Sequence, residues 1–121
     1  MESLRAAKKL LDASHHRSSV SRASYAAYAG ITARLVRRGT VFARGWNNPQ
    51  HELLPRFINN SGAFDHSERK LLNRAIRRLR LRREDADYRP RNLVDEAIAR
   101  EAVRDAASAL YVLGIVEDGD G

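Results

Sequence analysis

The stretch from Ser18 to Gly39, SSVSRASYAAYAGITARLVRRG, decides the fold. Its apolar or small residues recur at helical spacing, in the order Val20, Ala23, Ala27, Ile31 and Leu35. Ser18 or Ser19 can cap its start, and Gly39 follows a basic last turn, so both ends carry the signals of helix termini. Five alanines and Gly30 fill the middle. We therefore expect a central helix of about five turns that neighbouring helices approach closely.

The length and composition predict one globular domain. The 121 residues suit a single domain that buries its own core, and a content of 43% hydrophobic and 31% charged residues argues against wholesale disorder. Cysteine is absent, which excludes disulfides and thiolate metal sites. No apolar run approaches the roughly 20 residues that a membrane span needs. The first residues have an acid at position 2 and only a short apolar stretch, so we expect no signal peptide. We expect a cytoplasmic protein with no membrane contact.

The excess of positive charge indicates a partner that carries phosphate. The formal net charge is +7, and 19 of the 22 cations are arginine. Arginine binds phosphate and carboxylate through planar, paired hydrogen bonds, and a basic surface is typical of nucleic-acid binding. A GC-rich genome leaves the same composition, so the charge alone does not decide between nucleic-acid contact and codon usage.

The rest of the chain predicts further helices and no strand. The expected ranges are residues 2–12, 51–59, 65–87 and 91–114. Asp65 or Ser67 caps the 65–87 helix, and Arg91 or Asn92 begins the last one. The fold class expected is all-α: an up-and-down four-helix bundle with an additional short helix, formed by residues 1–114. Residues 115–121 are expected to be a disordered acidic tail.

The solvent face of the 65–87 helix is strongly basic. Its cations are Arg69, Lys70, Arg74, Arg77, Arg78, Arg80 and Arg82. Four of them fall within about two and a half turns and are predicted to bind nucleic-acid phosphates without sequence preference: Arg74, Arg77, Arg78 and Arg82. A helix-turn-helix DNA-binding protein would also explain the charge, but these helices are too long and too regularly up-and-down for that motif.

A second polar group involves the central helix and the end of the 65–87 helix. Asp87 lies where the helix dipole disfavours an acid, so it needs a cation. Arg83, one turn earlier, and Arg22 are both candidates, and we expect an ion pair between Arg22 and Asp87. Two interpretations stay open: a structural cluster of Arg22, Tyr25 and Asp87, or a groove in which arginine binds phosphate beside tyrosine.

Three residues are the candidate catalytic set. Arg83 interrupts the apolar stripe of its helix, Tyr88 follows little more than one turn later, and His51 begins the short helix after the loop. Histidine is the side chain whose ordinary pKa suits acid–base catalysis near neutral pH. The competing interpretation is that Arg83 pairs with Asp87 and that His51 faces solvent.

Other chemistries lack their motifs. The four histidines have no ligand spacing of a closed zinc site, and neither GxxxxGK[ST], GxGxxG nor GxSxG occurs. We therefore expect no metal and no cofactor.

Two short motifs resemble those of small bacterial and archaeal HEPN proteins. Residues 22–26, Arg-Ala-Ser-Tyr-Ala, resemble the Arg-Ala-Tyr-Tyr-Ala of that group, with Ser24 in place of a tyrosine. Residues 83–88 are similar to its Arg-x-x-Ala-Asp-Tyr motif, and His51 lies where the group often has a histidine. The resemblance extends over nearly the whole chain in helix order and spacing.

The resemblance implies an RNA-targeting protein, a metal-independent ribonuclease toxin of a toxin–antitoxin or defence system, with a homodimeric structure and a nucleotidyltransferase-like antitoxin as partner. In such an enzyme Arg83 would stabilise charge on the phosphate, and His51 or Tyr88 would be the acid–base. The Arg-x4–6-His motif of active HEPN ribonucleases is absent from its expected late helix. The alternative is a non-catalytic dimeric adaptor that binds nucleotide, nucleic acid or a nucleotidyltransferase.

Overall fold

The computed structural model describes residues 2–40, 54–60 and 62–114, and the regular structure among them is all helical. The helices are α1 (Glu2–Asp12), α2 (His16–Arg37), α3 (Leu54–Asn60), α4 (His66–Tyr88) and α5 (Glu96–Val112). The predicted all-α, up-and-down bundle with one additional short helix is therefore confirmed. The start of the 51–59 helix, residues 41–50 of the loop and the tail at 115–121 lie outside the described residues.

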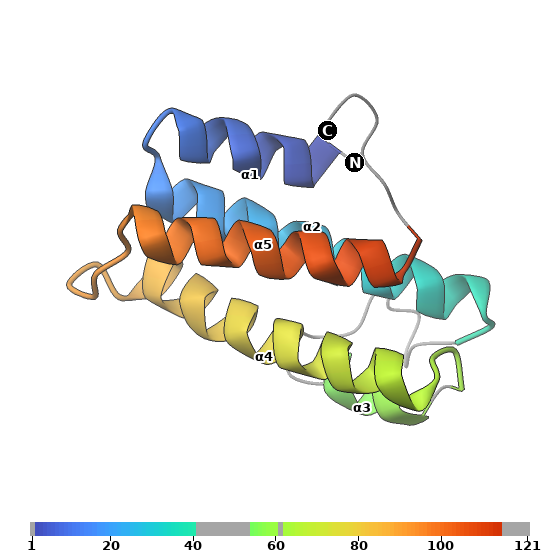
Figure 1. Cartoon of the computed structure of the whole chain (residues 1–121). Helices are drawn as coiled ribbons and strands as arrows, with labels where there is room; N and C mark the ends of the chain where they lie inside the picture. Colours follow the sequence, from blue (N-terminus) through green and yellow to red (C-terminus); the bar gives the residue numbers. More distant parts are fainter. Residues whose placement is uncertain (1, 41–53, 61, 115–121) are drawn as a thin grey trace.

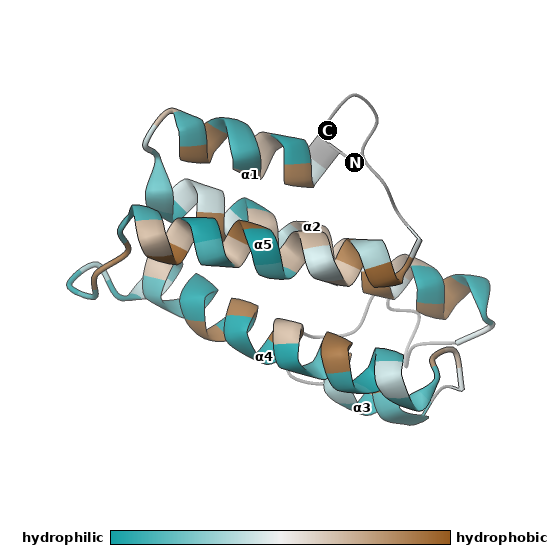
Figure 2. Ribbon diagram, viewed as in Figure 1, coloured by the Kyte–Doolittle hydropathy of each residue, from teal (hydrophilic) through white to brown (hydrophobic). Residues whose placement is uncertain are grey.

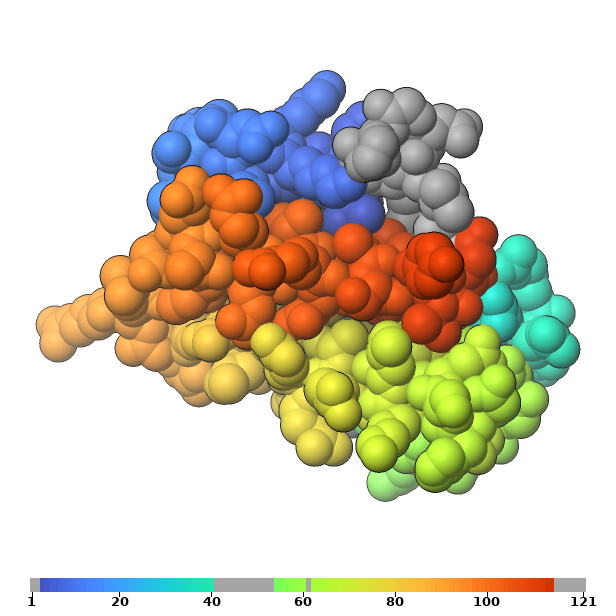
Figure 3. Space-filling view, in the orientation of Figure 1, coloured from blue at the N-terminus to red at the C-terminus, as the bar shows by residue number. Residues whose placement is uncertain are grey.

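Helix α2 lies at the centre of the bundle and contacts α1, α4 and α5 (Figure 1). The chain direction in α1 and α4 is opposite to that in α2, whereas α5 runs parallel to α2 (Figure 1). On the face drawn in the space-filling view, α5 lies between α1 and α4 (Figure 3). The short helix α3 packs against α4. The surface shared by α3 and α4 is thus at the edge of the bundle, away from α1.

Small residues explain why α2 can have three helical neighbours. Ala23, Ala26 and Ala27 are completely buried, and side chains of this size let helix backbones come close together. Ser19 is buried as well, and its hydroxyl donates to the carbonyl oxygen of Ala7 in α1 over 2.7 Å. The expectation that Ser18 or Ser19 caps the helix is wrong, because α2 begins earlier, at His16, without a side-chain cap.

The core follows the predicted apolar stripes. Buried residues on α4 are Leu72, Ala75, Ile76 and Leu79, and on α5 they are Ala99, Ala102, Val103, Ala106, Ala109 and Leu110. Figure 2 shows the consequence, since the hydrophobic stretches of α4 and α5 alternate with hydrophilic ones along each helix. The polar side of α4 is therefore left for solvent.

An aspartate caps the N-terminus of each of the two long C-terminal helices. Asp65 accepts a hydrogen bond from the Glu68 amide over 2.8 Å, and the Glu68 carboxylate accepts one from the Asp65 amide over 3.0 Å. This reciprocal capping box confirms one of the two predicted starts of α4. The predicted start of the last helix at Arg91 or Asn92 is wrong, because α5 begins at Glu96, where Asp95 caps the amide of Ile98 over 2.9 Å.

The search for membrane-spanning segments covered the described residues. Among them, no helix combines the length and the apolar character that crossing a bilayer requires.

Candidate nucleic-acid interface

A basic groove runs along the surface shared by α3 and α4. It has a volume of about 590 Å³. The lining residues are Asn59, His66, Arg69, Lys70, Asn73, Arg74, Arg77 and Arg78. All but Asn59 come from α4, because the hydrophobic face of that helix is turned to the core and the opposite side remains polar. The groove includes three of the four predicted phosphate-binding arginines, while Arg82 lies outside its lining.

Three cations of the groove are free to bind an anion. Lys70, Arg74 and Arg77 are exposed, and none of them forms an ion pair with a residue that the structure describes. They lie three and four residues apart, so they follow one side of α4 over about 10 Å. Arg69 is less available, since it donates to the carbonyl oxygen of Phe64 over 2.9 Å. Lys70, Arg74 and Arg77 therefore form the open part of the site.

The other two predicted arginines are occupied by acids of α5. Arg78 lies 2.6 Å from Glu101 and 3.2 Å from Asp105, and Arg82 lies 4.0 Å from Glu101. The hydrogen bond from Arg78 lowers the pKa of Glu101, while burial raises the pKa of Asp105 against the attraction of Arg78. Two cations and two acids nearly neutralise each other here. Arg78 and Arg82 thus contribute less positive potential than their positions in the sequence indicated.

The polar cluster at the opposite end of α4 differs from the prediction. Among the described residues, Arg22 and Asp87 form no ion pair. The Ser21 hydroxyl donates to Asp87 instead, and Arg83 lies 3.9 Å from the same carboxylate. Successive side chains of a helix are separated by about 100°, so with Ser21 facing α4 its neighbour Arg22 is exposed. The expected Arg22–Asp87 ion pair is wrong for that reason.

The structure brings together two of the three candidate catalytic residues. The guanidinium carbon of Arg83 lies 5.9 Å from the centre of the Tyr88 ring, and the Arg83 side chain is 26% exposed. Tyr88 itself is 68% exposed. His51 lies outside the described residues. Tyr25 is exposed and lines a separate, largely apolar groove on α2 with Tyr28 and Val36.

The sequence was compared with known protein families to find the family of this chain. The HEPN domain family matches it over residues 1–116. The chain belongs to the HEPN domain family. A search of curated proteins and a search of solved structures found no significant match. In this HEPN domain, the two motifs that carried the resemblance lie on α2 and α4, which contact each other.

Arg17 is a structural residue of this HEPN domain that the sequence did not single out. It lies in the first turn of α2, and its guanidinium donates to backbone carbonyls at the end of α4 and in the following turn. The acceptors are Asp85 at 2.8 Å, Ala86 at 3.3 Å, Arg89 at 3.3 Å, Pro90 at 3.0 Å, and Asn92. The carbonyls of Asp85 and Ala86 belong to the last turn of α4, where carbonyl groups lack an intrahelical partner. Arg17 therefore fixes the segment that carries Arg83, Asp87 and Tyr88.

Arg34 repeats this use of arginine at the other end of α2. It donates to the Leu113 carbonyl at the end of α5 over 2.7 Å, and its guanidinium lies 5.8 Å from the centre of the Phe64 ring. Neither arginine had a signal in the sequence, because their acceptors are backbone atoms of distant helices.

Over residues 2–40, 54–60 and 62–114, no three histidine, aspartate or glutamate side chains are grouped as a metal site would require.

Proposed function

We propose that this HEPN domain targets RNA, and that the groove between α3 and α4 binds the RNA backbone. The observation that carries the proposal is that Lys70, Arg74 and Arg77 line one groove and have no acidic partner within the described chain. Cations placed in a row bind consecutive phosphates and release counterions, which gives affinity without sequence preference. HEPN domains commonly act on RNA, which favours RNA as the polyanion.

The three free cations are tested by charge removal. Affinity for a short fluorescent single-stranded RNA is measured by anisotropy at about 0.1 M salt, where the Debye length is about 10 Å, for the wild-type chain and for Lys70→Ala, Arg74→Ala and Arg77→Ala. A charge-assisted hydrogen bond contributes about 1.5 kcal/mol, so each change lowers affinity about tenfold. Three variants that bind like the wild type would refute the groove as the RNA site.

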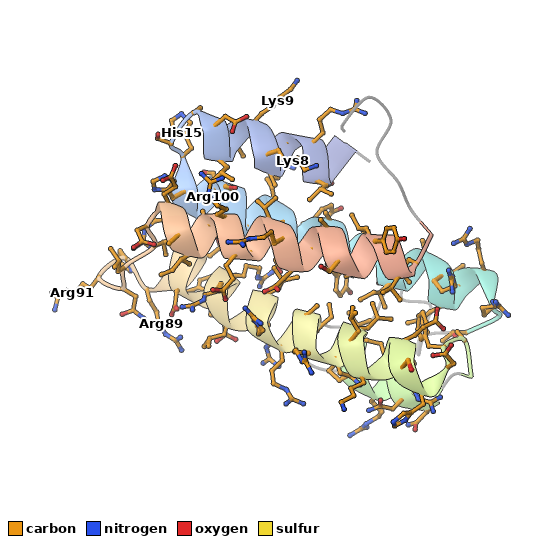
Figure 4. All side chains as sticks on the ribbon, viewed as in Figure 1. Lys8, Lys9, His15, Arg89, Arg91 and Arg100 are labelled. Carbon is orange, nitrogen blue, oxygen red and sulfur yellow. The ribbon has the colours of Figure 1, made fainter. Side chains whose placement is uncertain are left out.

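Arg91→Ala is the matched control. Arg91 is exposed in the turn between α4 and α5, at the end of the bundle far from α3 (Figure 4). Its replacement removes the same charge from the chain but leaves the groove intact. We expect its affinity to stay within about twofold of the wild type, because long-range charge effects are screened by salt.

A second candidate function is metal-independent cleavage of RNA, as in a toxin of a toxin–antitoxin or defence system. The contact between Arg83 and Tyr88 favours it, since a guanidinium beside a phenol can bind a phosphate and a hydroxyl of one nucleotide. The RNA 2′-hydroxyl would attack the adjacent phosphate to form a 2′,3′-cyclic phosphate, and the bond to the 5′-oxygen of the next nucleotide would break, so that this oxygen leaves as a 5′-hydroxyl. Arg83 would stabilise the charge on the phosphate. Tyr88, or His51 outside the described residues, would transfer the proton.

Incubation of purified protein with RNA in EDTA separates this enzyme from the non-catalytic adaptor. Cleavage that is lost in Arg83→Ala but retained in Arg91→Ala supports the enzyme. Intact RNA at every protein concentration supports the adaptor. Light scattering on the same samples tests the homodimer, and copurification with a nucleotidyltransferase-like protein tests the predicted partner.

A further inference from the structure

Two uncharged amides lie among the cations of the groove. Asn59 comes from α3 and Asn73 from α4, and the Asn73 side-chain nitrogen donates to the Asn59 side-chain oxygen over 2.8 Å. This is a polar link between the two helices that form the groove. Neither residue carries the charge that phosphate binding needs, so their presence there calls for another explanation.

The hydrogen bond leaves one amide group available. The Asn73 oxygen is buried and accepts no hydrogen bond within the described chain, so Asn73 is turned toward the protein. Asn59 is exposed, and its oxygen is already occupied by Asn73. Its NH2 group makes no hydrogen bond with a described residue. Asn73 thus fixes the Asn59 side chain, and the two N–H groups of the Asn59 amide remain available as donors at the groove.

The position of the Asn59–Asn73 pair relative to the cations indicates which part of a bound strand lies beside it. Asn73 lies on the same side of α4 as Lys70 and Arg77, three residues after the first and four before the second. These two cations are separated by about 10 Å along the helix axis. A nucleic-acid backbone alternates phosphate and sugar. A strand whose phosphates bind Lys70, Arg74 and Arg77 therefore places a sugar between two of these phosphates beside the amide pair.

We propose that Asn59, held by Asn73, donates a hydrogen bond to the ribose 2′-hydroxyl of a strand bound in the groove, so that the groove distinguishes RNA from DNA. This inference rests on the proposed binding of RNA by the same groove. The 2′-hydroxyl accepts and donates hydrogen bonds and is the group that DNA lacks. The cations bind both polymers, whereas the Asn59 amide forms its additional hydrogen bond only with RNA.

The test compares single-stranded RNA and DNA of the same sequence by anisotropy at one salt concentration. One hydrogen bond gives the wild-type chain a preference for RNA of about three- to tenfold. Asn59→Ala loses this preference by lowering RNA affinity while DNA affinity stays the same. Asn73→Ala has the same effect, and the double variant is no weaker than either single variant, because the two amides act through one contact.

Asn60→Ala is the matched control, since Asn60 is an exposed amide next to Asn59 that does not line the groove. It keeps the RNA preference. Equal wild-type affinity for RNA and DNA, or an equal loss for both polymers in Asn59→Ala, overturns the inference while binding by the cations stands. If Lys70→Ala, Arg74→Ala and Arg77→Ala all leave RNA affinity unchanged, the groove itself is not the RNA site, and the inference fails with it.

Discussion

Replacement of Arg17 by methionine removes the guanidinium that joins the start of α2 to the end of α4. The best bonds, one from each terminal nitrogen, are those to the carbonyls of Asp85 at 2.8 Å and Pro90 at 3.0 Å. A hydrogen bond from a charged group contributes about 1.5–3 kcal/mol. Arg17 is half-buried and water replaces part of its contacts, so the lower value applies to each bond. We expect a loss of about 3 kcal/mol in the free energy of unfolding.

Urea denaturation followed by circular dichroism measures this loss, and thermal denaturation shows it as a decrease of about 10 °C in Tm. Arg17→Lys keeps the charge but offers a single ammonium, so its stability lies between those of the wild type and the methionine variant. Arg91→Ala, at an exposed site of the turn with no ion pair to a described residue, stays within about 0.5 kcal/mol of the wild type. A loss below about 0.5 kcal/mol for Arg17→Met would refute the role given to this residue.

Two further predictions concern packing and charge. Ala27→Leu enlarges a completely buried residue of α2 and lowers the free energy of unfolding by about 1–3 kcal/mol, whereas Ala33→Leu, at an exposed position of the same helix, does not; urea denaturation checks both. Glu101→Gln destabilises the protein slightly at pH 7, because the hydrogen bond from Arg78 lowers the pKa of Glu101 from its usual 4.5. That stabilisation is present above pH 4.5 and is lost as the pH falls through the lower folded-state pKa of Glu101. The free energies of unfolding of the wild type and the variant therefore become equal in acid. A difference between them that persists in acid would contradict the stabilising role of the Glu101 carboxylate.

The fold could be predicted because its signals are local and repeated. The alanine-rich stripe of α2 and the stripe from Leu72 to Leu79 on α4 each recur over several turns, so single ambiguous residues do not change the result. The start of α5 was missed because Asn92 is as good a cap as Asp95 in sequence. The structure differs there because the Asn92 carbonyl is bound by Arg17 from a distant helix.

The candidate site could be predicted only in part. The basic face of α4 follows from helical spacing, but which cations are free depends on α5. Glu101 and Asp105 lie opposite Arg78, and nothing in the spacing of α4 indicates this. The partner of Asp87 was assigned to Arg22 instead of Ser21 because a shift of one residue along α2 turns the side chain by about 100°. Such choices depend on how two helices are rotated against each other.

The salt dependence of RNA affinity tests the central claim most directly. Three phosphate contacts give log affinity a slope of about −2.1 against log salt for a single strand, and Arg74→Ala reduces its magnitude by about 0.7 to about −1.4. Arg91→Ala keeps the wild-type slope. A slope that stays the same in Arg74→Ala, or that changes equally in Arg91→Ala, would contradict phosphate binding by the groove of α3 and α4.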